Sequence, residues 1–191
     1  MTHAPFTLRR WKRAEYEHLV GLGVFNREPI ELIGGQLVVA EPQYPYHADG
    51  ISAVDYTLRA MLPPGWIVRL QAPISLDDES EPEPDVAVVA GRPGDYRHAH
   101  PARPVLIVEV ADSSLAYDRV DKGSLYARAA IIDYWIVNLV DRVLEVHRDP
   151  APDPAAPYGW HYRSVTALAA PATIAPLAFP AAELAVADLI P

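Results

Sequence analysis

The stretch Pro104–Val110 constrains the fold of this chain more than any other, because apolar residues follow one another there without a break until Glu109. A continuous run of β-branched and other apolar residues is typical of a strand that is buried on both faces of a sheet. A carboxylate inside such a strand is unfavourable unless a cation, a hydrogen-bond partner or a cleft accompanies it. The run therefore predicts a central sheet. Glu109 lies either at a functional site or, if the strand ends at Val108, in solvent.

The remaining elements follow from hydrophobic periodicity and turn residues. Helical spacing predicts helices over Thr7–Gly21, Tyr46–Leu62 and Tyr117–Ala130. The segment Pro29–Val39 is typical of a β-hairpin, because Gly34-Gly35 can supply the positive φ angles of a two-residue turn. Short apolar runs predict further strands at Trp66–Leu70, Ile74–Leu76, Asp85–Ala90, Tyr134–Asn138, Val143–His147, Trp160–Val165 and Thr173–Phe179. We expect a single α/β (α+β) domain over residues 1–191, with a mixed central sheet flanked by helices and additional β-hairpins.

Composition excludes several classes of protein. The chain has no cysteine, which excludes disulfides, thiolate catalysis and cysteine-bound zinc. No apolar stretch is long enough for a signal peptide or a membrane span, so we expect a cytoplasmic protein with no membrane contact. The net charge of -9 disfavours extended contact with nucleic acid, unless a local basic patch provides it.

Asp85 begins another predicted strand, directly after Glu81-Pro82-Glu83-Pro84. The two prolines hold this approach extended and set where the strand begins. Aspartate after proline is also an ordinary turn residue, so both interpretations stay open for Asp85 alone. Glu81 and Glu83 are expected to be solvated loop charges.

Lys122 lies on the apolar stripe of the third predicted helix, because Leu125, Tyr126 and Ala129 share its face. It also lies near the expected start of that helix, where the macrodipole disfavours a cation. Lys122 is therefore either a functional residue opposite carboxylates or a lysine whose head reaches out to solvent from the edge of the stripe.

His47 and Glu31 are weaker candidates. His47 shares a helix stripe with Ile51, Val54 and Leu58, and a histidine in that position is more often structural than catalytic. Glu31 lies on the mixed face of the predicted hairpin, which is expected to be solvent-exposed. The sequence contains no glycine-rich phosphate loop, no Walker pattern, no Gly-x-Ser-x-Gly elbow and no His-Glu-x-x-His.

The order and spacing of the acidic residues and the lysine resemble the PD-(D/E)XK nuclease superfamily, and within it the Uma-two family of restriction-type endonucleases. The resemblance rests on Pro84-Asp85, on Glu109 in an apolar strand and on Lys122. It extends over nearly the whole chain through pieces that follow in the same order: Glu31-Leu-Ile-Gly-Gly-Gln, Pro45-Tyr46-His47, Glu83-Pro84-Asp85-Val-Ala-Val-Val, Val108-Glu109-Val110, Asp118-Arg-Val-Asp-Lys122, Tyr126-Ala127 and Asp133-Tyr134-Trp135-Ile136-Val137.

The resemblance implies a restriction-endonuclease-like fold and metal-dependent hydrolysis of phosphodiester bonds. It implies Mg²⁺, with Mn²⁺ as a substitute, held by Asp85, Glu109 and the carbonyl of Val110. Carboxylate and carbonyl oxygens are the ligands that Mg²⁺ prefers. Lys122 would be the catalytic lysine, and Glu31 would lie beside the metal, in contrast to its expected solvent exposure. His47 is an accessory candidate.

Two departures from the superfamily pattern are visible. The lysine usually lies two residues after the second acid, where this chain has Ala111, so the site is complete only if the helix with Lys122 returns over the sheet. Gly34 stands where the family more often has aspartate, and we expect this to affect only the turn.

The expected partner is nucleic acid, with DNA favoured over RNA. A small acidic catalytic domain needs a second copy to engage a duplex, so a homodimer is expected. Two other interpretations remain: a catalytically inactive nucleic-acid-binding or regulatory module on the same fold, and an oligomeric interaction protein whose acidic residues are incidental.

Overall fold

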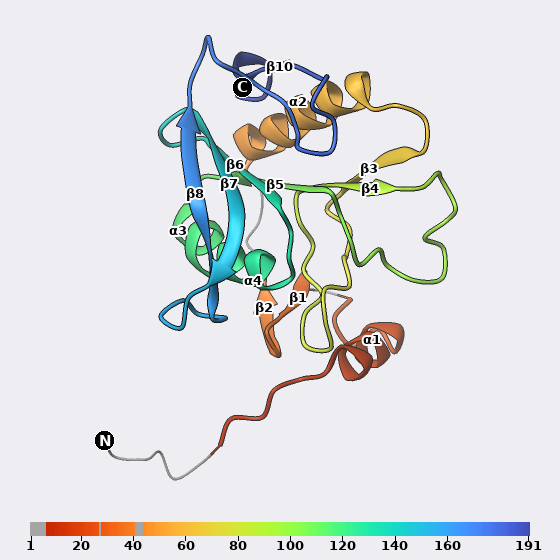
Figure 1. Ribbon diagram of the computed structural model, residues 1–191. Coiled ribbons are helices and arrows are strands. Elements are labelled where there is room, and N and C mark those ends of the chain that lie inside the picture. The colour runs from red at the N-terminus through yellow and green to blue at the C-terminus, as the bar shows by residue number, and fades with distance from the viewer. Residues whose placement is uncertain (1–6, 27, 41–43) are drawn as a thin grey trace.

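A six-stranded mixed sheet forms the centre of the computed structural model, which describes residues 7–26, 28–40 and 44–191 (Figure 1). The strands follow the order β3-β4-β5-β6-β7-β8, and β5 and β6 are parallel neighbours while the other neighbours are antiparallel. Their bounds are β3 Trp66–Leu70, β4 Val86–Ala90, β5 Leu106–Ala111, β6 Asp133–Asn138, β7 Val143–Pro152 and β8 Trp160–Leu168. The mixed sheet confirms the predicted fold class.

Strand β5 is buried along its whole length, as its unbroken apolar sequence predicts. Val108 and Val110 contribute to the hydrophobic core on one face, and Ile107 and Ala111 contribute to the core on the other. The strand does not end at Val108, so Glu109 lies inside it, buried, on the same face as Ile107.

Helices cover both faces of the sheet (Figure 1). Helix α2 (Pro45–Met61) packs Ile51, Val54 and Leu58 against the face that carries Val108. The C-terminal segment packs with the same core and contains β9 (Thr173–Ile174), β10 (Leu184–Ala185) and the 3-10 helix η2 (Val186–Asp188). The opposite face is covered by a helical run made of α3 (Leu115–Tyr117), the π-helix η1 (Asp118–Lys122) and α4 (Gly123–Arg128).

This helical run differs from the single helix expected over Tyr117–Ala130. It begins at Leu115, so Lys122 lies within the run and not in its first turn. The expected conflict between Lys122 and the helix macrodipole is therefore wrong, because that effect is confined to the terminal turns. Burial of the lysine is what requires carboxylate partners. A π turn inside a helix widens it locally and is frequent at functional sites.

The N-terminal elements follow the prediction with shorter bounds. Helix α1 spans Arg13–Gly21 and does not begin at Thr7; at its start the backbone N–H of Lys12 donates to Glu15 Oε2 at 3.0 Å. The hairpin has strands β1 (Ile30–Ile33) and β2 (Gln36–Val39). Gly34 and Gly35 both have positive φ angles, as its two-residue turn requires.

One predicted strand is wrong and another is shorter than predicted. The segment 74–76 forms no ladder, because its backbone N–H groups donate singly to Pro82, Pro101 and Ser80. The run expected at 173–179 pairs only over Thr173–Ile174, since proline and turn residues follow. Among the residues described, no helix combines the length and the apolar character needed to cross a membrane.

Candidate active site

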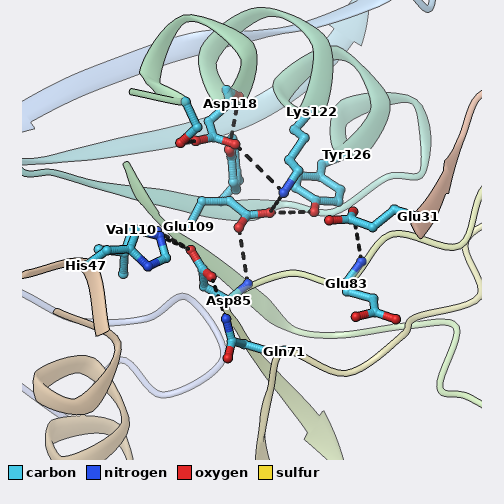
Figure 2. Close-up of polar contacts among 12 residues, drawn as sticks. Glu31, His47, Gln71, Glu83, Asp85, Glu109, Val110, Asp118, Lys122 and Tyr126 are labelled. Atoms are coloured by element: carbon cyan, nitrogen blue, oxygen red, sulfur yellow. Dashed lines mark hydrogen bonds and ion pairs between the residues drawn. The ribbon is translucent and has the colours of Figure 1, made fainter. Parts of the chain in front are cut away.

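Asp85 and Glu109 meet where β4 begins and β5 approaches its end. Antiparallel pairing of Val86 with Val108 sets this register. The backbone N–H of Asp85 donates to Glu109 Oε2 at 3.1 Å, and the backbone N–H of Val110 donates to Asp85 Oδ2 at 2.9 Å. Each carboxylate is thus held by the backbone of the other strand, and the pair converges (Figure 2).

Glu109 is 2% exposed and receives two side-chain donors from the helical run. Lys122 Nζ and the Tyr126 hydroxyl both donate to Glu109 Oε1, at 3.0 Å and 2.7 Å. Burial raises the pKa of Glu109 to about 8, because desolvation and the negative charges of Asp85 and Asp118 outweigh the attraction of Lys122. Burial therefore favours the protonated form of Glu109 unless further positive charge comes close to it.

Lys122 is surrounded by carboxylates. Its side chain is 11% exposed, and Nζ lies 3.0 Å from Glu109 and 3.8 Å from Asp118. Burial opposes its charge, but the carboxylates of Glu109, Glu31, Asp118 and Asp85 outweigh this and raise the pKa of Lys122 well above its ordinary value. Its head is therefore an ammonium and does not reach out to solvent.

Glu31 is buried, and the expected solvent exposure is wrong. Glu31 is only 8% exposed, because β1 packs beside the loop that leads to Asp85. The backbone N–H of Glu83 donates to Glu31 Oε2 at 3.1 Å, and Glu31 faces the site in Figure 2.

Glu81 and Glu83, in the loop before Asp85, also depart from the expected solvent exposure. Glu81 is buried, with its pKa raised to about 7 by burial, and burial likewise raises the pKa of the half-buried Glu83.

His47 reaches Asp85 from the first turn of α2. Its Nε2 lies 3.3 Å from Asp85 Oδ2, and the backbone of Val110 lies within hydrogen-bonding reach of the ring. The hydrogen bond to Asp85 raises the pKa of His47, against the opposing effect of burial. The stripe that it shares with Ile51 on α2 accounts for this direction.

Three residues in or around the site were not predicted from the sequence as site residues. Asp118 is 2% exposed, accepts a hydrogen bond from the Ser114 hydroxyl at 2.6 Å and lies beside Lys122. Tyr126 orients Glu109. The Gln71 amide lies 3.4 Å from Asp85 Oδ1. Asp118 precedes Lys122 by four residues and Tyr126 follows it by four, and this helical spacing is the signal that could have identified them.

The donor set at this site suits a hard divalent cation. Asp85 and Glu109 supply carboxylate oxygens, and the carbonyl of Val110 supplies another oxygen next to them. Within residues 7–26, 28–40 and 44–191, no group of three or more histidine, cysteine or acidic side chains is placed so that it could hold a metal ion. Mg²⁺ commonly binds through one or two carboxylates and keeps several waters, so the residues present fit such an ion.

Comparisons with known proteins identify a family and a solved structure of similar fold. A family model named Uma2 and described as "Putative restriction endonuclease" matches residues 13–187. Among solved structures, the chain is similar to a protein from Anabaena variabilis ATCC 29413 described as a "putative nuclease belonging to DUF820". The identity is 16%, the TM-score is 0.64, and the match covers 84% of this chain and 89% of that one, which supports a shared fold. No curated protein matches the chain.

Proposed function

The chain belongs to the Uma2 family, and we propose that it is a metal-dependent endonuclease that hydrolyses phosphodiester bonds of nucleic acid, with Asp85, Glu109 and Lys122 at its centre. The observation that carries the proposal is the charge balance of the buried site. Carboxylates of Glu31, Asp85, Glu109 and Asp118 act on one ammonium, that of Lys122. Buried negative charge in excess of its partners is unfavourable, and a divalent cation supplies the missing charge.

Asp85, Glu109 and the carbonyl of Val110 would hold Mg²⁺, or Mn²⁺ in its place. Such an ion lowers the pKa of a bound water and neutralises charge on the scissile phosphate. The backbone N–H groups of Asp85 and Val110 fix the two carboxylates, and the Tyr126 hydroxyl fixes Oε1 of Glu109. Glu31 lies beside Lys122. Its carboxylate would orient a nearby water, or contact the ion through a water that the ion binds.

Lys122 stabilises negative charge and does not act as a general base. A general base must be unprotonated near neutral pH. The surrounding carboxylates raise the pKa of Lys122 and so favour its protonated form. Its ammonium keeps Glu109 in place before substrate arrives. When negative charge develops on a phosphate oxygen during cleavage, the Lys122 ammonium can interact with that oxygen as well as with Glu109.

DNA is the proposed substrate, and a homodimer is the proposed assembly. The acidic balance of the chain argues against a long single-protomer contact with a duplex, and a second copy would extend the contact. Light scattering over a range of concentrations tests the assembly. A protein that stays monomeric at high concentration would contradict it.

A cleavage assay tests the activity. Duplex DNA, single-stranded DNA and RNA are incubated with the purified protein in Mg²⁺, in Mn²⁺ and in EDTA. We expect cleavage of DNA only with metal. We also expect its loss in Asp85→Asn, which removes one ligand charge with little change of shape. Asp112→Asn, at an exposed aspartate just after β5, is the matched control and keeps activity. Binding of nucleic acid without cleavage under every condition would favour the inactive regulatory module instead.

A further inference from the structure

His47 brings an imidazole nitrogen to two oxygens that would hold the metal of the proposed nuclease. Nε2 lies 3.3 Å from Asp85 Oδ2, and the backbone of Val110 is within hydrogen-bonding reach of the same ring. In Figure 2, Asp85 lies between His47 and Glu109. The other ring nitrogen, Nδ1, is buried and has no hydrogen-bond partner among the described residues. Nε2 is therefore the nitrogen that fixes the ring in the site.

The distance between Nε2 and Oδ2 is close to that of two neighbouring ligands on one ion. Adjacent ligands of an octahedral ion lie about 3 Å apart when each bond is about 2.1 Å long. A metal ion on Asp85 and Val110 would therefore come within bonding range of Nε2 or would have to displace the ring.

The packing of α2 favours bonding over displacement. Gly50 follows His47 by about one helical turn, and a Cβ built on Gly50 would lie 2.8 Å from Val110 Cγ1. The glycine thus lets α2 approach β5 closely at Val110 itself. The side chain of His47 is 17% exposed, so the ring has little open space into which it could turn.

We infer that His47 Nε2 is a further metal ligand of this site, beside Asp85 and the carbonyl of Val110, and that it makes the site prefer Mn²⁺ to Mg²⁺. The inference rests on the proposed function and deepens it. As a neutral ligand the ring keeps its proton on Nδ1 and gives the Nε2 lone pair to the ion; a second proton, where Nε2 carries one, leaves to solvent. Imidazole is a good ligand for transition metals, whereas Mg²⁺ selects oxygen ligands, so an imidazole in the set shifts the preference toward Mn²⁺.

The test measures the bound metal directly and needs no substrate. Pulsed electron paramagnetic resonance of Mn²⁺ on the wild-type protein detects a directly bound imidazole as a nitrogen coupling. Isothermal titration gives the affinities for Mn²⁺ and Mg²⁺. Both are repeated with His47→Gln, which places an amide at a similar reach, and with His161→Gln, which changes a half-exposed histidine on β8.

We expect a nitrogen coupling in the wild-type protein and in His161→Gln, and its loss in His47→Gln. Affinity for Mn²⁺ should fall by about tenfold or more in His47→Gln, as for other losses around a metal site, while affinity for Mg²⁺ changes less. Binding of Mn²⁺ by wild-type protein without the coupling would overturn this inference alone. Failure of wild-type protein to bind either ion would overturn the proposed metal dependence as well.

Discussion

Two buried glutamates on the same face of the sheet have opposite electrostatic surroundings. Glu109 and Glu145 lie in one row across three strands, because both pair with Ile136 of β6, from β5 and β7. Burial raises the pKa of Glu109 to about 8. Burial acts in the same direction on Glu145, but hydrogen bonds from Arg119 and Asn138 outweigh it and lower the pKa of that carboxyl.

The partners explain the difference. Arg119 donates to both oxygens of Glu145, and the Asn138 amide donates to Oε1 at 2.7 Å. Glu145 therefore has a cation of its own. Glu109 shares Lys122 with the other carboxylates of the site, so its charge is only partly compensated. Burial of a carboxylate alone does not mark a functional site. Incomplete compensation of the buried charge does.

The largest expected effect is the loss of cleavage in Lys122→Met. This change keeps the apolar stem and removes the ammonium. Removal of one preorganised charge from an active site typically lowers the rate by about 100-fold or more. The unfolding temperature in Mg²⁺ should stay near that of wild-type protein, because the ion supplies positive charge to the same carboxylates. Cleavage rates and thermal unfolding with metal check the two parts. Unchanged cleavage would show that the catalytic lysine has been misassigned.

Arg119→Met makes the matching change at the other glutamate and should give the opposite result. Cleavage should stay within about twofold of wild-type, because Arg119 touches no residue of the proposed centre. Stability should fall by about 1–2 kcal/mol. Removal of one partner of a fully buried pair costs more, but the Arg119 side chain is 42% exposed and water compensates part of the loss. Urea unfolding measures this. A variant as stable as wild-type protein would show that the ion pair between Arg119 and Glu145 does not stabilise the fold.

The pH dependence of Glu145→Gln sharpens the comparison further. The folded state lowers the pKa of Glu145 below its ordinary value of 4.5. The carboxylate therefore contributes stability above pH 4.5, and this contribution is lost as the pH falls below that value. We expect the difference in unfolding temperature between wild-type and Glu145→Gln protein to be largest near pH 6 and to shrink toward pH 3.5. A difference that grows on acidification would contradict the lowered pKa.

The smallest expected effect comes from Gly50→Ala. The new Cβ would crowd Val110, so α2 must shift slightly and carry His47 with it. Affinity for Mn²⁺ should fall by a factor of a few. Gly21→Ala, at a helical glycine with no atom within 4 Å of the added Cβ, controls for the general effect of the exchange. Equal Mn²⁺ affinities of the two variants would mean that the approach of α2 does not position a ligand.

The sequence predicts much of this sheet because its strands are strongly patterned. The apolar run places Glu109 inside a strand, and the two prolines place Asp85 directly before another. The same signal, an acid in an apolar strand, was present in Val143-Leu-Glu-Val-His147 and could have identified Glu145 as buried. Its partner Arg119 could not have been inferred, because that contact depends on where the helical run crosses the sheet.

Tertiary packing explains the other failures. Glu31 lies on a hairpin face that is mixed in sequence, and only the packing of the loop before Asp85 against β1 buries it. The early start of the helical run at Leu115 and its π turn likewise depend on contacts with the sheet, such as that of the Tyr134 hydroxyl with the carbonyl of Asp118. Local propensity carries no information on such contacts.

Titration of Mn²⁺ into wild-type, Glu109→Gln and Glu145→Gln protein shows whether the incompletely compensated glutamate is the one that binds metal, because it compares the two glutamates in one experiment. Each protein is first shown to be folded at the temperature used. We expect wild-type and Glu145→Gln protein to bind the ion with similar affinity and Glu109→Gln to bind it at least about tenfold more weakly. Equal binding by all three proteins, or weaker binding by Glu145→Gln than by Glu109→Gln, would contradict this expectation.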